Sequence, residues 1–242
     1  MKIIISPSKT QSFTNEKNQI EVLLKKETIT LYEIIKKLSQ EKFQKIFKIK
    51  GKLLEDTLFK YNLKNVDKPV GKVIESYTGV VFEQLELDSY NIEQLDYLNK
   101  NLRILSAMYG VLSPSDYIYP YRLDMTVKLP KINLYSYWQK TIDEYFVDED
   151  IVVNLASLEF SKMLKNYSGR FVDIEFYEET KENQLKVVSY NAKKCRGQML
   201  NFLIKNQVED ISKIKEFVFE GYIFSENLSN KDKFIFVRKI DC

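Results

Sequence analysis

The hydrophobic and polar positions of the first 61 residues predict a buried strand followed by helices. The isoleucines within residues 2–5 form a short apolar run, which is typical of a strand buried on both faces. From Thr28 to Tyr61 the apolar residues recur at helical spacing, and Gly51 interrupts the later part. We therefore expect a helix, a tight hairpin and a second helix across Gln40–Tyr61.

The rest of the chain alternates between helical and strand patterns. The expected elements are a loop at Lys64–Lys72, a helix at Ile92–Lys100, a strand at Leu102–Leu105, a long loop at Tyr109–Ile132, a helix at Leu134–Phe146, a strand at Ile151–Leu155, a helix capped by Ser157 and ending at Leu164, a hairpin of Phe171–Tyr177 with Leu185–Tyr190, a helix at Ala192–Gln207, and strands at Val218–Phe224 and Phe234–Arg238. No repeat or linker divides the chain. This order predicts a single α/β (mixed α+β) domain over residues 1–242, with a mixed central sheet, flanking helices and a basic helix-hairpin-helix-like insertion at 28–72.

Composition narrows the class of protein. The chain has 242 residues, of which 44% are hydrophobic, and this excludes a disordered chain or a disulfide-rich secreted scaffold. No apolar run approaches the roughly 20 residues that span a bilayer, and the N-terminal apolar run is too short for a secretory signal. We expect a cytoplasmic protein without a membrane partner, and a monomer.

Missing residue types limit the chemistry. The sequence has no histidine and two cysteines, Cys195 and Cys242, which excludes a Ser-His-Asp triad, a Cys-His dyad and any histidine-ligated metal site. We expect Cys195 to be a small helix residue that faces the core. The sequence therefore predicts no cofactor and no stable transition-metal site.

Positive charge is concentrated in two stretches, although the net charge is only +3. Residues 36–72 contain eleven lysines and four acidic residues, a net charge of +7, and residues 183–208 contain five basic residues and no acid. Such segregation is typical of a polyanion partner, although a solvated lysine-rich surface gives the same pattern. Only five of the 37 basic residues are arginine. We therefore expect arginine where planar, bidentate recognition of phosphate or carboxylate is needed.

Five motifs resemble those of one family. They are ISPSKT at 5–10, LRILSAMYGVL at 102–112 followed by PYRLDM at 120–125, NLAS at 154–157 followed by Glu159 and Phe160, AKKCRG at 192–197, and EGYIF at 220–224. In this order and over nearly the whole chain, they are similar to the motifs of the YaaA family of peroxide-stress proteins. One element departs from the family pattern: Gly79-Val80-Val81-Phe82 stands where the family has G-D-V-Y, so Val80 inherits no role of that acid.

The resemblance implies a function. It implies a cytosolic bacterial protein that protects against hydrogen peroxide, with lower free iron and less oxidative DNA damage, and an α/β fold with a helix-hairpin-helix and a positively charged cleft that binds DNA. We place that motif on Ile46–Leu54, with Gly51 at the hairpin. The expected DNA contacts are Lys45, Lys48, Lys50, Gly51, Lys52, Lys194 and Arg196.

Polar residues of the motifs are candidates for one pocket. They are Ser6, Lys9, Tyr109, Tyr121, Arg122, Asp124, Glu159, Lys193, Lys194 and Arg196. Structural roles are open for each group: a capping serine, an Arg122–Asp124 pair that braces the long loop, a glutamate near a helix N-terminus, or a core tyrosine. Two functions remain. One is a protein that binds duplex or damaged DNA largely independently of sequence, and the alternative is an enzyme that acts on a nucleobase or nucleotide in this pocket.

Overall fold

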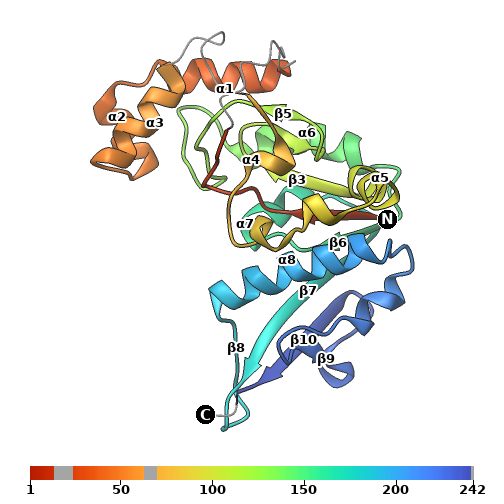
Figure 1. Cartoon of the computed structure of the whole chain (residues 1–242). Helices are drawn as coiled ribbons and strands as arrows, with labels where there is room; N and C mark the ends of the chain where they lie inside the picture. The colour runs from red at the N-terminus through yellow and green to blue at the C-terminus, as the bar shows by residue number, and fades with distance from the viewer. Residues whose placement is uncertain (14–23, 63–69, 241–242) are drawn as a thin grey trace.

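The computed structural model describes residues 1–13, 24–62 and 70–240. A mostly parallel sheet forms the centre of the described protein, in the order β4-β3-β1-β6-β7-β10-β9, with β8 paired to β7 (Figure 1). Its strands are β1 (Lys2–Ile5), β3 (Leu102–Ser106), β4 (Gly110–Leu112), β6 (Ile151–Asn154), β7 (Arg170–Glu179), β8 (Leu185–Lys186), β9 (Ile223–Phe224) and β10 (Lys233–Lys239). Strands β3, β1, β6, β7 and β10 run parallel, and β4, β8 and β9 are antiparallel to their neighbours. A separate antiparallel pair joins β2 (Gly71–Lys72) to β5 (Tyr117–Ile118).

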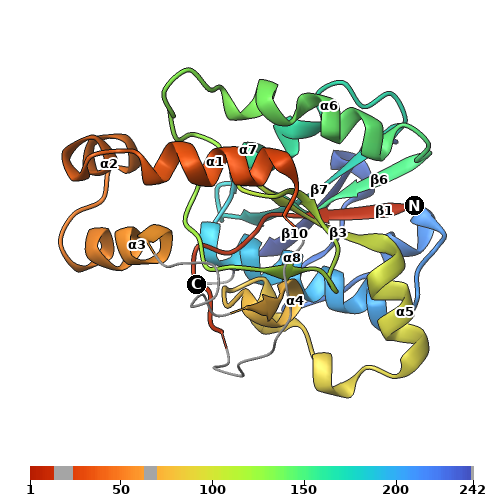
Figure 2. The same cartoon turned by 90° about the horizontal axis from the view of Figure 1, so that it is seen from above.

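Helices cover both faces of the sheet (Figure 2). They are α1 (Lys26–Lys36), α2 (Gln40–Phe47), α3 (Lys52–Asn62), α4 (Val73–Ser76), α5 (Ile92–Asn101), α6 (Leu134–Phe146), α7 (Leu158–Ser161) and α8 (Ser189–Lys205), with 3₁₀ segments at Phe82–Gln84, Leu87–Ser89, Lys162–Leu164, Ile211–Glu216 and Glu226–Leu228. Helix α6 lies on one face, and α5 and α8 lie on the other. The predicted fold class, a mixed α/β domain built on one central sheet, is confirmed.

Local sequence explains several of these elements. Ile3, Ile4 and Ile5 of β1 are completely buried, because β1 lies between two parallel neighbours and beneath helices on both sides. Helix α5 begins with a capping box, in which the side chain of Asn91 accepts from the backbone N–H of Gln94 and the Gln94 side chain accepts from that of Asn91. Paired caps of this kind satisfy backbone donors that a helix leaves free at its start.

Five expected elements differ from the structure. The long loop at Tyr109–Ile132 contains two strands, β4 and β5, because Gly110, at φ +75°, turns the chain back along β3. The loop expected at Lys64–Lys72 ends in β2, and its residues 64–69 lie outside the described part. The second hairpin strand is short because α8 begins at Ser189. The strand expected at Val218–Phe224 is reduced to β9, and the helix after Ser157 becomes 3₁₀ at Lys162.

Helices α2 and α3 project from one end of the sheet, α1 connects them to the sheet domain, and we call residues 24–62 the helical arm (Figures 1 and 2). The two helices expected across Gln40–Tyr61 are present as α2 and α3. Inside the arm, the ring of Phe43 stacks on that of Phe47 at a centroid distance of 4.1 Å and meets Tyr61 edge-on at 5.9 Å. Hydrogen bonds tie the arm to the rest of the protein, from Thr28 Oγ1 to Met108 O (3.0 Å) and from Tyr61 Oη to Arg122 O (2.7 Å).

Candidate functional site

Ser6 and Ser157 connect the loops that follow two parallel strands, β1 and β6. The hydroxyl of Ser6 donates to Ser157 Oγ at 3.1 Å and accepts from the backbone N–H of Ser157 at 2.9 Å. Ser157 therefore occupies the N-cap position of α7 without capping it through its side chain, because its hydroxyl is bonded to Ser6. Ligands usually bind at the carboxyl ends of parallel strands in α/β sheets. The Ser6–Ser157 bonds hold two loops together at that edge of the sheet.

Asn154 fixes the same loop from within the sheet. Its side-chain N–H₂ donates to Asp173 Oδ1 of β7 at 2.6 Å, and its carbonyl oxygen accepts from the N–H of Ala156 at 2.8 Å. Asn154 is 5% exposed, so both polar ends of a buried amide are bonded. The NLAS motif thus has a structural basis: Asn154 and Ser157 hold the β6–α7 turn in place.

Lys9 and Asp124 join the first motif to the long loop. The ammonium group of Lys9 lies 2.9 Å from Asp124 Oδ2. Beside this ion pair is a small cavity of about 30 Å³, lined by Pro7, Ser8, Lys9, Gln11, Tyr121, Arg122, Leu123, Asp124 and Phe160. Four predicted pocket residues, Lys9, Tyr121, Arg122 and Asp124, therefore lie together. Asp124 pairs with Lys9, and no Arg122–Asp124 ion pair is present among the described residues.

Glu159 holds the long loop against α7. Its Oε1 accepts from the backbone N–H of Met125 at 2.9 Å, and its backbone carbonyl accepts from Tyr135 Oη at 2.8 Å. Glu159 is therefore attached to the segment that carries Arg122 and Asp124, and it is not among the residues that line the 30 Å³ cavity.

Tyr109 and Tyr121 belong to a buried cluster of phenols. Tyr121 Oη lies 2.7 Å from Tyr77 Oη and 2.9 Å from Ser106 Oγ, and Tyr109 Oη lies 3.1 Å from Tyr32 Oη. Burial raises the pKa of Tyr121 to about 12 and that of Tyr109 well above its ordinary value. These hydroxyls therefore stay protonated near neutral pH and serve as hydrogen-bonding groups of the core.

Basic residues near the start of α8 have three different surroundings. Lys193 is exposed, whereas Lys194 pairs with Glu220 at 2.5 Å and lies 5.2 Å above the ring of Phe219. The guanidinium of Arg196 is largely buried, and burial lowers its pKa, an effect that the negative charges of Glu175 and Asp173 oppose. Its buried Nε has no hydrogen-bond partner among the described residues.

The turn between α2 and α3 carries the predicted DNA-binding lysines. Lys48 and Gly51 both have positive φ, at +53° and +58°, so the chain reverses within four residues. Lys45, Lys48 and Lys50 line one open hollow of about 440 Å³ together with Glu41, Gln44 and Ile49. Lys52 is the first residue of α3, where backbone N–H groups lack intrahelical partners. The assignment of this turn to a helix-hairpin-helix DNA-binding motif stays a prediction.

The described residues show neither a metal-binding cluster nor a membrane-spanning helix. Across residues 1–13, 24–62 and 70–240, no group of three or more histidine, cysteine, aspartate or glutamate side chains is arranged to hold a metal ion. No helix within these ranges has the length and apolar character needed to cross a membrane.

Comparison with known proteins places the chain in a family. The family model described as peroxide stress protein YaaA matches residues 1–228. The chain belongs to the YaaA peroxide-stress family. A UPF0246 protein of Fusobacterium nucleatum is 39% identical over 249 residues, covering 99% of each chain, and one of Finegoldia magna is 37% identical over 246 residues with the same coverage. A UPF0246 protein of Clostridium beijerinckii is 35% identical over 256 residues, 99% of this chain and 98% of its own.

Family membership confirms the resemblance and fits the arrangement of the motifs. The first motif meets the PYRLDM motif through the Lys9–Asp124 pair and the NLAS motif through the Ser6–Ser157 bonds. The AKKCRG motif meets the element that departs from the family pattern, because Gly197 lies against the backbone of Val81. Motifs that are far apart in the sequence are therefore neighbours around the strand ends.

One contact beside the site carried no signal in the sequence. Tyr61 of α3 donates its hydroxyl to the carbonyl oxygen of Arg122, more than sixty residues away along the chain, and only the fold shows this bond.

Proposed function

We propose that this YaaA-family protein acts in the peroxide-stress response by binding DNA, largely independently of sequence, and thereby limits iron-dependent oxidative damage to it. The observation that supports DNA binding is the α2–α3 turn, where Lys45, Lys48 and Lys50 line one hollow and Lys52 opens the next helix. Lysine side chains and free N–H groups at a helix start both favour phosphate oxygens. Such contacts give affinity without reading the bases.

The remaining predicted DNA contacts, Lys194 and Arg196, differ from the hairpin lysines in ion pairing and burial. Lys194 is already paired with Glu220, and the guanidinium of Arg196 is largely buried. The hairpin lysines, by contrast, have no ion pair among the described residues. We therefore expect the helical arm to make most of the contacts with the DNA backbone.

A titration across salt concentrations tests the proposal. With four to six phosphates neutralised, the logarithm of the binding constant for a random duplex should fall against the logarithm of salt with a slope of roughly −4 to −5. Replacing Lys48, Lys50 and Lys52 together by glutamine should flatten this slope by about 2–3 units, because each lost contact releases about one counterion fewer. Fluorescence anisotropy on one duplex and one single strand measures both slopes.

The control removes two charged groups at a distant site. Asp148, Glu149 and Asp150 follow α6, and replacing Asp148 and Asp150 by asparagine should leave the slope unchanged. If the wild-type protein fails to bind either nucleic acid at low salt, or the triple variant keeps the wild-type slope, the hairpin is only a solvated surface.

The alternative function, an enzyme that acts on a nucleobase or nucleotide, has one supporting observation. Lys9, Arg122 and Asp124 meet beside the ends of parallel strands, where α/β enzymes bind substrates. The cavity beside them holds about 30 Å³, whereas pockets for small molecules usually measure about 300–1,000 Å³. A nucleobase would need this loop to open, so DNA binding remains the better supported proposal.

A further inference from the structure

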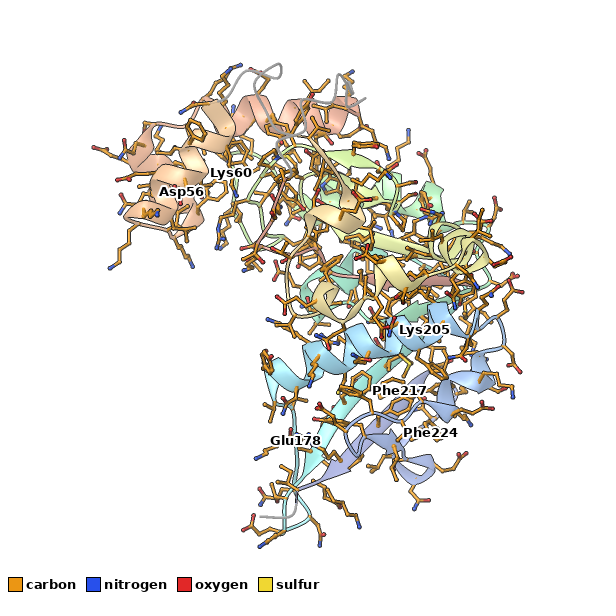
Figure 3. The ribbon with its side chains drawn as sticks, viewed as in Figure 1. Asp56, Lys60, Glu178, Lys205, Phe217 and Phe224 are labelled. Carbon is orange, nitrogen blue, oxygen red and sulfur yellow. The ribbon has the colours of Figure 1, made fainter. Side chains whose placement is uncertain are left out.

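A second hollow lies at the edge of the sheet opposite to the strand-end motifs. It has a volume of about 420 Å³, and its walls come from the 3₁₀ segment Ile211–Glu216, the connection between β9 and β10, and the first residue of β7. That residue, Arg170, pairs with Ile151 at the start of β6, so the hollow is at the amino ends of these parallel strands. Figure 3 shows Phe224, which lines the hollow, far from Asp56 and Lys60 of the helical arm.

Two phenylalanine rings form an apolar wall of the hollow. Phe224 is the last residue of the EGYIF motif, and Phe234 belongs to β10. Their ring centroids are 5.6 Å apart and their planes are nearly perpendicular, at 79°. Phe234 is 3% exposed, whereas Phe224 is only partly buried. A partly exposed ring in a hollow offers a surface on which a planar group can pack.

Positive charge lies directly beside these rings. The ammonium group of Lys215 is 4.9 Å from the ring centroid of Phe224 and 5.6 Å from that of Phe234. Its ion-pair partner, Glu226, is 3.7 Å away and has a side chain that is 80% exposed. So exposed an ion pair contributes little to stability, and an anion in the hollow can replace Glu226 as the partner of Lys215.

Arg170 and Asn230 add hydrogen-bond donors to the same hollow. The Arg170 guanidinium is held through Nη2, which donates to the carbonyl oxygen of Lys231 at 2.5 Å, and its Nε lies 3.9 Å from Asp232 Oδ1. The carbonyl oxygen of the Asn230 side chain accepts from the backbone N–H of Asp232 at 2.9 Å, which orients the amide. A guanidinium fixed in this way is suited to bind an anionic oxygen, and only five of the 37 basic residues are arginine.

We propose that this hollow binds a nucleotide, with its base packed against Phe224 and its phosphate group bound by Arg170 and Lys215. Three cationic residues line the hollow, Arg170, Lys215 and Lys231, against one acid, Glu226. A dianionic phosphate matches this excess of positive charge. The volume of about 420 Å³ falls in the range of about 300–1,000 Å³ that is usual for small-molecule sites. The site does not depend on the proposed DNA binding, since no residue of the α2–α3 turn lines it.

Calorimetric titration with nucleotides tests the site. AMP and CMP should bind the wild-type protein with a Kd below about 1 mM. Ribose 5-phosphate, which lacks the base, and adenosine, which lacks the phosphate, should each bind at least about tenfold more weakly than AMP. Arg170→Gln and Lys215→Gln should each weaken AMP binding about tenfold, because each removes a charged donor to the phosphate.

Lys213→Gln is the matched control. Lys213 belongs to the same 3₁₀ segment as Lys215 and also pairs with a glutamate, Glu216, at 2.8 Å, but it does not line the hollow. This variant should bind AMP like the wild-type protein. Lys215→Arg keeps the positive charge and should retain most of the affinity for AMP.

A change of the ring tests the place of the base. Phe224→Leu keeps an apolar side chain and removes the aromatic ring, so AMP should bind about as weakly as ribose 5-phosphate does, whose own affinity should not change. The unfolding midpoint of each variant without ligand shows whether it is folded. If Phe224→Leu does not fold, the Arg170 and Lys215 variants, at partly exposed side chains, decide the result.

The Lys48, Lys50 and Lys52 triple variant separates this site from the helical arm. It should bind AMP like the wild-type protein, and Lys215→Gln should keep the wild-type salt slope on duplex DNA, so either proposal can fail without the other. The nucleotide site is refuted if neither AMP nor CMP binds the wild-type protein below about 5 mM. It is equally refuted if the triple variant loses AMP binding while Arg170→Gln and Lys215→Gln keep it.

Discussion

At the scale of single residues, Cys195 is the obvious candidate for a peroxide-reactive group, and its surroundings argue against that function. The side chain is 1% exposed, and burial raises the pKa of its thiol to about 12. Only the thiolate attacks peroxide, and with that pKa about one thiol in ~10⁵ is ionised at pH 7. Cys195 is therefore poorly suited to react with peroxide in the folded protein.

Cys195 should resist oxidation in the folded protein. In a Cys242→Ser background, treatment with hydrogen peroxide at pH 7 should produce no sulfenic acid at Cys195, because the thiol is protonated and out of contact with solvent. Mass spectrometry with a sulfenic-acid probe measures this, and the same protein unfolded in denaturant is the control that should react. Rapid labelling of the folded protein would show that the thiol is accessible.

The hydroxyl of Tyr121 should contribute to the stability of the folded protein. It bonds to both Tyr77 and Ser106 in the core, so Tyr121→Phe leaves two buried hydroxyls short of a partner. This should lower the free energy of unfolding by about 1–3 kcal/mol. Chemical denaturation measures the change, and Tyr190→Phe, at a tyrosine that is 61% exposed, should change it by less than about 0.5 kcal/mol.

At the scale of elements, Gly197 sets how closely α8 approaches the segment before α5. An added Cβ would collide with the carbonyl oxygen of Val81 and with the side chain of Gln84. The glycine of the AKKCRG motif is therefore required for packing, whereas a sequence motif with glycine beside basic residues also fits a phosphate loop. The bond between Gln198 Nε2 and Gln84 Oε1, at 3.1 Å, depends on the same close approach.

Gly197→Ala should destabilise the protein, although alanine normally favours a helix over glycine by about 0.5–1 kcal/mol. Here the Val81 backbone must move away from α8, and we expect a net loss of about 1–3 kcal/mol. Differential scanning calorimetry compares it with Lys193→Ala, an exposed position of the same helix that should change stability little. An unchanged or higher midpoint for Gly197→Ala would mean that the segment adapts without cost.

The elements with a clear periodic pattern were predictable from the sequence, and the short strands were not. Helix α6 runs over Leu134–Phe146 as expected, and β1 and β3 match within one residue, because their apolar positions follow one period. Strand β5 has only two residues, and its pairing with β2 is a tertiary contact. For the site, the motifs identified Lys9, Tyr121, Arg122 and Asp124, but the pairing of Lys9 with Asp124 depends on loops that meet only in the fold.

At the scale of the whole molecule, the lysines of the α2–α3 turn lie apart from the sheet domain, and the attachment of the helical arm decides how they are oriented. The helical arm projects from one end of the sheet, and its junction with the body is held by hydrogen bonds such as Thr28 Oγ1 to Met108 O and Tyr61 Oη to Arg122 O. An arm fixed in this way presents its lysines in a constant orientation. If the proposed DNA binding holds, a duplex at the α2–α3 turn should lie in a defined position relative to the strand-end residues.

Protection of DNA should follow occupancy by the protein. If the chain limits iron-dependent damage by covering the backbone, plasmid nicking by Fe²⁺ and hydrogen peroxide should fall as protein saturates the DNA. The protection should disappear in about 0.5 M salt, where phosphate contacts are lost. The Lys48, Lys50 and Lys52 triple variant should protect poorly at concentrations where the wild-type protein protects well. Agarose-gel quantification of nicked plasmid measures this protection. A colorimetric Fe²⁺ assay run in parallel should find the free iron unchanged, because the histidine-free sequence offers few good iron ligands. Protection that persists in high salt together with a fall in free Fe²⁺ would show that the protein acts on the metal instead of on the DNA.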